Sequence, residues 1–178
     1  LRSNDAIRSL IRETIITPSD FLVPLFVVEG KGIKEEIPSM PNYYRLSLDN
    51  LEKEVKELWH MGLGAVLLFV KVPDNLKDNI GSEALNENGL MQLAIKTVKN
   101  ACPDMLVMTD VALDPYSSYG HDGIVADGQI LNDESVEVLA EMSVSHAKAG
   151  ADFVAPSDMM DGRILSIREA LEDEGYTN

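Results

Sequence analysis

The sequence predicts an α/β fold built on a parallel β-sheet, and three observations support this class. Short, continuously apolar runs recur along the chain, as is typical of parallel strands buried on both faces. Amphipathic helical patterns lie between these runs, which makes a succession of βα units. No Gly-x-Gly-x-x-Gly or P-loop motif follows the first run, so nucleotide-binding open sheets are disfavoured. A doubly wound sheet or half of an eight-stranded βα barrel fits this pattern.

Four strands are predicted, in residues 21–28, 64–70, 105–109 and 151–155. Each is four to eight residues of mostly Val, Leu, Phe, Met and Ala, too short for a typical helix. In a parallel sheet that forms a barrel, functional residues lie on the loops that follow the carboxyl ends of such strands. We therefore expect the polar residues after these runs to carry the chemistry.

Helices are predicted between the strands. The first runs from Asp49, an N-cap with Glu52 as its capping-box partner, to Gly62, which ends it. Its apolar stripe has the i, i+4, i+7, i+8 spacing of one helix face and consists of Leu51, Val55, Leu58 and Trp59. The other helices are expected at 86–101, 132–150 and 161–173, and the proline at 103 and the glycine at 150 end two of them.

Composition restricts the classes of partner. The 178 residues can form one domain with a sizeable core, and 45% apolar and 25% charged residues are ordinary for a globular protein. The formal charge of −15 argues against nucleic-acid and membrane partners, because such a surface repels phosphate groups. Cys102 is the only cysteine, so a disulfide framework and a cysteine-type zinc site are both excluded. We expect a cytoplasmic protein.

The segment after the third strand is unusual. About twenty residues separate it from the next helix, against roughly two to six in a typical βα loop. Its first part, residues 110–123, holds three carboxylates, Asp110, Asp114 and Asp122, together with His121. Carboxylate oxygens suit Mg²⁺ or a similar cation, and one His would also permit Zn²⁺. Because Asp, Gly, Pro and Ser are also turn formers, a solvated acidic loop stays open as an alternative.

This loop resembles the metal loop of the porphobilinogen synthase (5-aminolevulinate dehydratase) family, with Ala112, Asp114 and Asp122 at positions that hold cysteine in the zinc enzymes. Further blocks match the family in order along essentially the whole chain. They are Thr17-Pro-Ser-Asp-Phe21, Ile37-Pro-Ser-Met-Pro41, Gly81-Ser-Glu-Ala84, Asn88-Gly-Leu90 and Ala155-Pro-Ser-Asp-Met-Met-Asp-Gly-Arg163.

The resemblance implies a (β/α)8 TIM barrel of which residues 1–178 form about the first four βα units. Residues 1–20 would then be the remainder of an N-terminal arm and an entry helix. The family is a lyase of haem and chlorophyll biosynthesis that condenses two 5-aminolevulinate molecules into porphobilinogen. Its two Schiff-base lysines would lie beyond residue 178. The resemblance also implies a homo-octamer, in the cytoplasm or in a plastid if the source is a plant or alga.

Site residues follow by their match to the family motifs. Asp110 would handle protons, and Ser157 and Asp158 would hydrogen-bond to substrate or to a catalytic lysine. Their structural alternatives are a turn aspartate and a Pro-Ser-Asp helix cap. Asp114 and Asp122 are candidate Mg²⁺ ligands, although an active-site metal is not required. Asp161 resembles a residue near an allosteric Mg²⁺, and a first-turn acidic residue is its alternative.

Other polar residues carry weaker expectations. Lys71 follows a predicted strand, where a barrel could place a Schiff-base lysine, but it does not match the family's lysines. His60 and His146 are expected to be structural, His121 to orient the loop, and Arg163 to be an ion-pair partner.

Two functional alternatives remain open, a catalytically silent paralogue or regulatory subunit and another Mg²⁺-dependent barrel lyase. In addition, half a barrel leaves sheet edges open, so residues 1–178 alone should fold poorly or self-associate.

Overall fold

The computed structural model describes residues 2–177 and is built around one six-stranded sheet. The strands lie in the order β2 (Lys34–Glu36), β3 (Tyr44–Leu46), β1 (Val23–Val28), β4 (Ala65–Lys71), β5 (Leu106–Val111) and β8 (Phe153–Pro156). All neighbouring strands from β3 to β8 are parallel, and β2 runs antiparallel to β3. The predicted parallel α/β sheet is therefore confirmed, and the short strands β2 and β3 are additions to it.

The predicted helices are also present, with ends that differ by a few residues. They are α2 (Leu48–His60), α3 (Leu90–Ala101), α4 (Asn132–Ala149) and α5 (Arg163–Asp173), preceded by a short α1 (Asp5–Leu10). Single 3-10 turns occur at Pro18–Asp20, Asp74–Leu76 and Ser82–Leu85. Within the described part of the chain, none of the helices combines the length and the apolar character that crossing a bilayer requires.

Helices α2, α3 and α4 pack against one face of the sheet. Alternate side chains, such as Leu25 and Val27 on β1 and Val66 and Leu68 on β4, are fully buried with α2 and α3 in a common apolar core. The residues between them point to the opposite face and are only half-buried, among them Phe26, which stacks on Phe69 at a centroid distance of 5.1 Å. The expectation of strands buried on both faces is thus wrong for β1 and β4, whereas the end of β5, at Thr109, Asp110 and Val111, is buried on both faces.

Covering one face only distinguishes the two predicted architectures. A doubly wound sheet carries helices on both faces, whereas a barrel carries them on the outside only. The arrangement is therefore consistent with part of a βα barrel and not with a doubly wound sheet.

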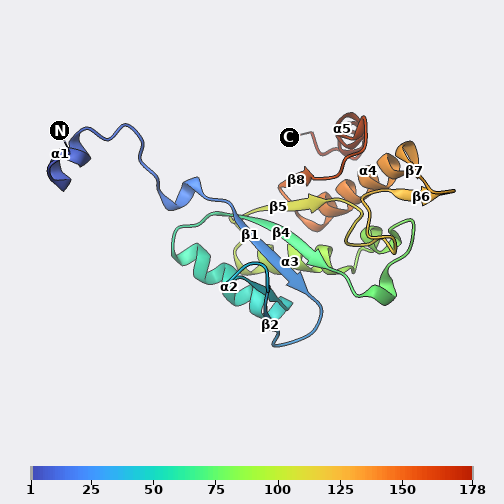
Figure 1. The fold of residues 1–178 in the computed structure, drawn as a ribbon, viewed down its shortest axis with the longest axis horizontal. Helices are drawn as coiled ribbons and strands as arrows, with labels where there is room; N and C mark the ends of the chain where they lie inside the picture. Colours follow the sequence, from blue (N-terminus) through green and yellow to red (C-terminus); the bar gives the residue numbers. More distant parts are fainter. Residues whose placement is uncertain (1, 178) are drawn as a thin grey trace.

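The N-terminal segment projects from this body. α1 lies at the far end of an extended stretch, well away from the sheet (Figure 1). Its apolar residues face solvent, with Leu10 85% and Ile15 69% exposed. This segment makes little contact with the fold, as an arm would, and the division at residue 20 stays a prediction.

The start of α2 differs from the prediction. Ser47, not Asp49, is the N-cap residue. The Asp49 carboxylate accepts hydrogen bonds from the Gly32 N–H at 3.0 Å and the Ser47 hydroxyl at 2.6 Å. Asp49 therefore ties the β1–β2 connection to the helix instead of capping it.

A β-hairpin within the long β5–α4 connection was not predicted. It consists of β6 (Ile124–Ala126) and β7 (Gln129–Leu131). Asp127 and Gly128 form its turn with φ values of 50° and 74°, as a type I′ turn requires. Asp-Gly is the usual sequence signal for this turn, so the sequence did contain evidence for the hairpin.

Candidate active site

A cleft of about 580 Å³ opens at the carboxyl ends of the parallel strands, where a βα protein is expected to bind its ligand. Its lining brings together residues from four strands and from the loops that follow them. They are Phe26, Arg45, Phe69, Val70, Lys71, Val72, Lys77, Asp110, Asp114, Pro115, Asp122 and Ser157. Cavities of about 570 and 540 Å³ lie elsewhere, but neither contains these carboxylates, so chemistry and not size selects the site.

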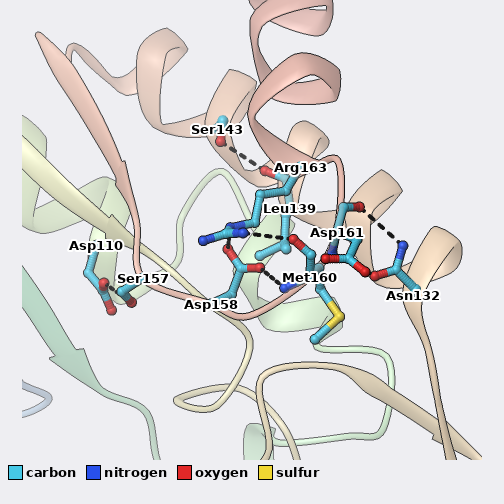
Figure 2. Close-up of polar contacts among 9 residues, drawn as sticks. All are labelled: Asp110, Asn132, Leu139, Ser143, Ser157, Asp158, Met160, Asp161 and Arg163. Atoms are coloured by element: carbon cyan, nitrogen blue, oxygen red, sulfur yellow. Dashed lines mark hydrogen bonds and ion pairs between the residues drawn. The ribbon is translucent and has the colours of Figure 1, made fainter.

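Asp110 lies at the centre of this chemistry. It was expected after the third strand, but it is inside β5, where it pairs with Ala155 of β8. This register places Ser157 beside it, and the Ser157 hydroxyl donates to the Asp110 Oδ1 at 2.6 Å (Figure 2). Two of the predicted site residues, from segments 47 positions apart, are thus joined directly.

The environment of Asp110 favours its neutral form. The residue is 8% exposed, and burial raises the pKa of its carboxyl, with the hydrogen bond from Ser157 opposing this effect and the negative charges of Asp114, Asp122 and Asp158 adding to it. A carboxyl with a raised pKa can take up and release protons closer to neutral pH than an ordinary aspartate.

Asp114 and Asp122 line the same cleft from the carboxylate loop, which we define as residues 112–123. Asp114 is more open to solvent than Asp110, yet partial burial and the nearby charge of Asp122 both raise the pKa of its carboxyl. Mutual repulsion of two carboxylates is relieved by a cation or by a proton. Ala112 is buried and supplies no ligand atom, so this pair cannot be extended to the three-ligand set of a cysteine-type site.

Asp161 lies apart from the cleft. Its backbone N–H donates to the Asn132 Oδ1 at 2.8 Å, and its carbonyl accepts from the Asn132 Nδ2 at 3.1 Å (Figure 2). Its own carboxylate is on an exposed residue. Across residues 2–177 there is no group of three or more His, Cys, Asp or Glu side chains arranged to share a metal ion. The three predicted metal residues are therefore divided between two places, and their role stays a prediction.

Asp158 faces away from the cleft lining and into the protein. Its side chain is fully buried beside Arg163, with an Nε to Oδ2 distance of 3.0 Å that makes an ion pair rather than an aligned hydrogen bond. The Met160 N–H donates to its Oδ1 at 2.7 Å. Burial raises the pKa of Asp158, and the Met160 N–H and the charge of Arg163 oppose this effect.

These contacts give Asp158 a structural role that the sequence had not indicated. Gly162 is the N-cap of α5, so the alternative of a Pro-Ser-Asp helix cap is wrong. The carboxylate instead closes an Asx-type turn and holds Arg163, whose guanidinium also donates to the Met160 carbonyl at 2.7 Å. Arg163 is thus the ion-pair partner it was expected to be.

The histidines follow their expectations in location. His146 on α4 is fully buried, with its Nδ1 3.0 Å from the Thr109 hydroxyl on β5, whereas His60 is exposed on α2. The Gly123 N–H donates to the His121 Nδ1 at 3.3 Å, so the imidazole stabilises the bend of the carboxylate loop.

Basic groups at the rim were mostly missed. Arg45, Lys71 and Lys77 line the cleft, and of these only Lys71 directly follows a predicted strand. Arg45 lies on β3, a three-residue strand with no periodicity signal, and Lys77 lies in a loop. These side chains meet because β3, β1 and β4 are neighbours in the sheet, and this strand order cannot be read from the sequence.

Together, the fold and the cleft define an α/β protein of the class that carries its ligand site at the carboxyl ends of parallel strands, here with three carboxyl groups in the cleft lining. The chain belongs to the delta-aminolevulinic acid dehydratase family, whose model matches residues 1–178. The family resemblance of the sequence blocks is thereby confirmed.

Individual relatives agree with this membership. The chain is 49% identical over 176 residues to the delta-aminolevulinic acid dehydratase of Chlamydia pneumoniae, covering 99% of this chain and 53% of that protein. It is 48% identical over 178 residues to the Bacillus subtilis enzyme, covering 100% of this chain and 54% of that protein. A chloroplastic relative from Glycine max is 50% identical, with 98% and 43% covered.

A solved structure is similar over the same region. The Toxoplasma gondii delta-aminolevulinic acid dehydratase, crystallised in complex with the reaction product porphobilinogen, superposes with a TM-score of 0.94 at 48% identity and covers 99% of this chain and 50% of that one. The chain therefore spans about half the length of the relatives that it matches.

Proposed function

We propose that the full-length protein is a porphobilinogen synthase, which condenses two molecules of 5-aminolevulinate into porphobilinogen with loss of two waters. The observation that carries this proposal is the strand-end cleft, in which Asp110 and Ser157 are joined and Asp114 and Asp122 converge. These residues belong to the two blocks most specific to the family. The product-bound Toxoplasma gondii structure supports a small-molecule ligand of this kind.

The proposed architecture is a closed (β/α)8 barrel of which this chain supplies about the first half. Coverage of about half of each relative supports this, as do helices confined to one face of the sheet. The apolar residues Leu106, at the start of β5, and Phe153, on the edge strand β8, are 46% and 51% exposed. In the closed barrel, the second half would cover this surface.

In the proposed condensation of 5-aminolevulinate, the residues of this chain serve as acid–base and positioning groups. Asp110 moves protons during imine formation and ring closure, because its raised pKa suits both protonation states. Ser157 orients the Asp110 carboxyl through its hydroxyl. The Schiff-base lysines are expected beyond residue 178, so Lys71 serves as a cationic group at the rim. Asp158 acts from behind the cleft by fixing the turn that follows Ser157, rather than by contact with substrate.

The donor set of the cleft fits a hard cation such as Mg²⁺ but not a thiolate zinc site. Asp114 and Asp122 would hold it, with water completing the shell, as Mg²⁺ commonly requires. A bound cation would supply positive charge that offsets the carboxylates near the substrate. Asp161 would contribute to a separate, allosteric Mg²⁺ site outside the cleft.

The assembly we propose is a homo-octamer in which the N-terminal arm packs on another subunit. The projecting α1 and the exposed apolar residues that follow it support an intermolecular contact (Figure 1). The compartment we propose is the cytoplasm, or a plastid if the source is a plant or alga, as the names of the chloroplastic relatives suggest.

The test is an assay of the full-length protein for porphobilinogen formation from 5-aminolevulinate, after chelation and then with added Mg²⁺ or Zn²⁺. We expect activity that Mg²⁺ restores or raises. Activity that responds to Zn²⁺ alone would contradict the metal assignment. A downstream half that lacks either barrel lysine, together with no activity, would favour a catalytically silent paralogue.

A further inference from the structure

The carboxylate loop is attached to a segment that precedes α3, at residues 78 and 79. The Asp78 N–H donates to the Tyr116 carbonyl at 3.2 Å, and the Ser118 N–H donates to the Asp78 carbonyl at 2.9 Å. These two bonds make an isolated parallel bridge between the β4–α3 connection and the loop. The first half of the loop is therefore joined to this segment through backbone groups, while Leu113 and Tyr116 anchor it in the apolar core.

The second attachment uses a side chain. The Asn79 Nδ2 donates to the Val125 carbonyl at 2.9 Å, and the Val125 N–H donates to the Asn79 Oδ1 at 3.1 Å. Val125 pairs with Ile130 in the hairpin, next to the turn-closing pair of Ala126 and Gln129. Because adjacent antiparallel pairs alternate between bonded and non-bonded, the Val125 backbone groups point away from β7. The Asn79 amide satisfies both, as a neighbouring strand would.

The other end of this attachment is rigid. The Asp78 carboxylate accepts hydrogen bonds from the Ser82 N–H, at 3.0 Å, and from the Ser82 hydroxyl. Gly81 between them has a φ of 65°, a conformation that glycine adopts without strain. Asn79 therefore lies in a turn that the bonds between Asp78 and Ser82 close. Its contact with Val125 fixes the hairpin relative to this turn.

We propose that Asn79 is a positioning residue for Asp122. Asp122 lies three residues before Val125, and Gly123 between them packs so tightly that an added Cβ would lie 2.6 Å from the Ile130 Cγ2. Fixing Val125 thus fixes the end of the carboxylate loop and the placement of Asp122 opposite Asp110 and Asp114. This inference rests on the proposed function of the same cleft.

The experiment uses the full-length protein with Asn79→Ala, the isosteric Asn79→Asp and the control Asn86→Ala. Asn86 belongs to the same connection and is exposed, and its side chain bonds to the neighbouring Glu83 and Asn88, away from the hairpin. kcat and KM for 5-aminolevulinate, borohydride trapping of the substrate, Tm, and hydrogen exchange of residues 118–131 are measured for each variant.

We expect Asn79→Ala to lower kcat/KM by about tenfold to a hundredfold, as misplacement of a catalytic group by about 1 Å does. Exchange over residues 118–131 should speed up, while trapping persists. Asn79→Asp keeps the acceptor for the Val125 N–H and should fall between wild type and Asn79→Ala, which also provides the test if the alanine variant does not fold. Asn86→Ala should match wild type.

Three outcomes separate the positioning role of Asn79 from the proposed function. If wild type is active and the Asn79 variants match Asn86→Ala in kcat/KM and in exchange, the positioning role is overturned. The same holds if Asn79→Ala lowers Tm but leaves kcat/KM unchanged. If wild type itself forms no porphobilinogen, the proposed function fails, and hydrogen exchange alone then decides whether Asn79 orders the loop.

Discussion

Removing the Ser157 hydroxyl should raise the pKa of Asp110, because that hydroxyl donates to the Asp110 Oδ1 at 2.6 Å. A hydrogen bond to a charged group contributes about 1.5–3 kcal/mol. Because Ser157 is an exposed residue, water replaces part of this hydrogen-bond energy in the variant. The Asp110 carboxylate should therefore lose about 1.4 kcal/mol of stabilisation. This corresponds to a rise of about one pH unit in the pKa, in addition to the increase that burial already causes.

The assay is the pH dependence of kcat/KM for Ser157→Ala in the full-length protein. If activity needs the Asp110 carboxylate, the acid limb of the pH profile should move about one pH unit upward, while the plateau at higher pH changes less. Ser166→Ala is the matched control, because Ser166 lies on α5 and does not line the cleft. An acid limb that stays in place, or moves to lower pH, would refute the coupling of Ser157 to Asp110.

Two further predictions concern stability, and a third concerns self-association. Burial lowers the pKa of His146 to about 4 from 6.5; the unfolded chain therefore binds the proton first, and stability should fall by about 3 kcal/mol as pH drops from 6.5 to 4. Urea unfolding of wild type and His146→Gln checks this, and equal pH dependence would contradict it. Gly123→Ala should lower stability by about 1–3 kcal/mol through overpacking. The measurement is Tm, and the control is Gly64→Ala, whose added Cβ would meet nothing closer than 4.0 Å. Equal Tm values for the two variants would refute the clash. Residues 1–178 alone should self-associate in sedimentation experiments through the open sheet edges, and a monomer that unfolds cooperatively would argue against half a barrel.

Regular elements of the fold were predictable because each depends on a local pattern. The apolar runs of β1 and β4 follow from the periods that side-chain burial imposes. Leu51, Val55 and Leu58 on α2 do so too, whereas Trp59, the fourth residue of the predicted stripe, is 41% exposed. The half-buried face of the sheet was not predictable. An apolar run indicates that a strand is buried, but it does not show which part of the full-length protein covers it. The short strands β2 and β3 contain only three residues each, too few for a periodic signal.

The site was predictable in composition but not in arrangement. The unusual length and acidity of the β5–α4 connection indicated Asp110, Asp114 and Asp122, and family resemblance added Ser157. The contact of Ser157 with Asp110 depends on the register of β8 against β5, a long-range property. For the same reason the inward position of Asp158 beside Arg163 and the attachment of Val125 by Asn79 could not be predicted from sequence.

We propose that Asp110 of this chain is the acid–base group of a porphobilinogen synthase. The most direct test of this proposal compares the full-length protein with its Asp110→Asn variant, measuring porphobilinogen formed from 5-aminolevulinate and substrate trapped by borohydride. We expect wild type to form porphobilinogen, and the variant to lose about a hundredfold or more in kcat while trapping persists. An Asp110→Asn variant with undiminished kcat, or a wild-type protein that forms no porphobilinogen, would contradict the account.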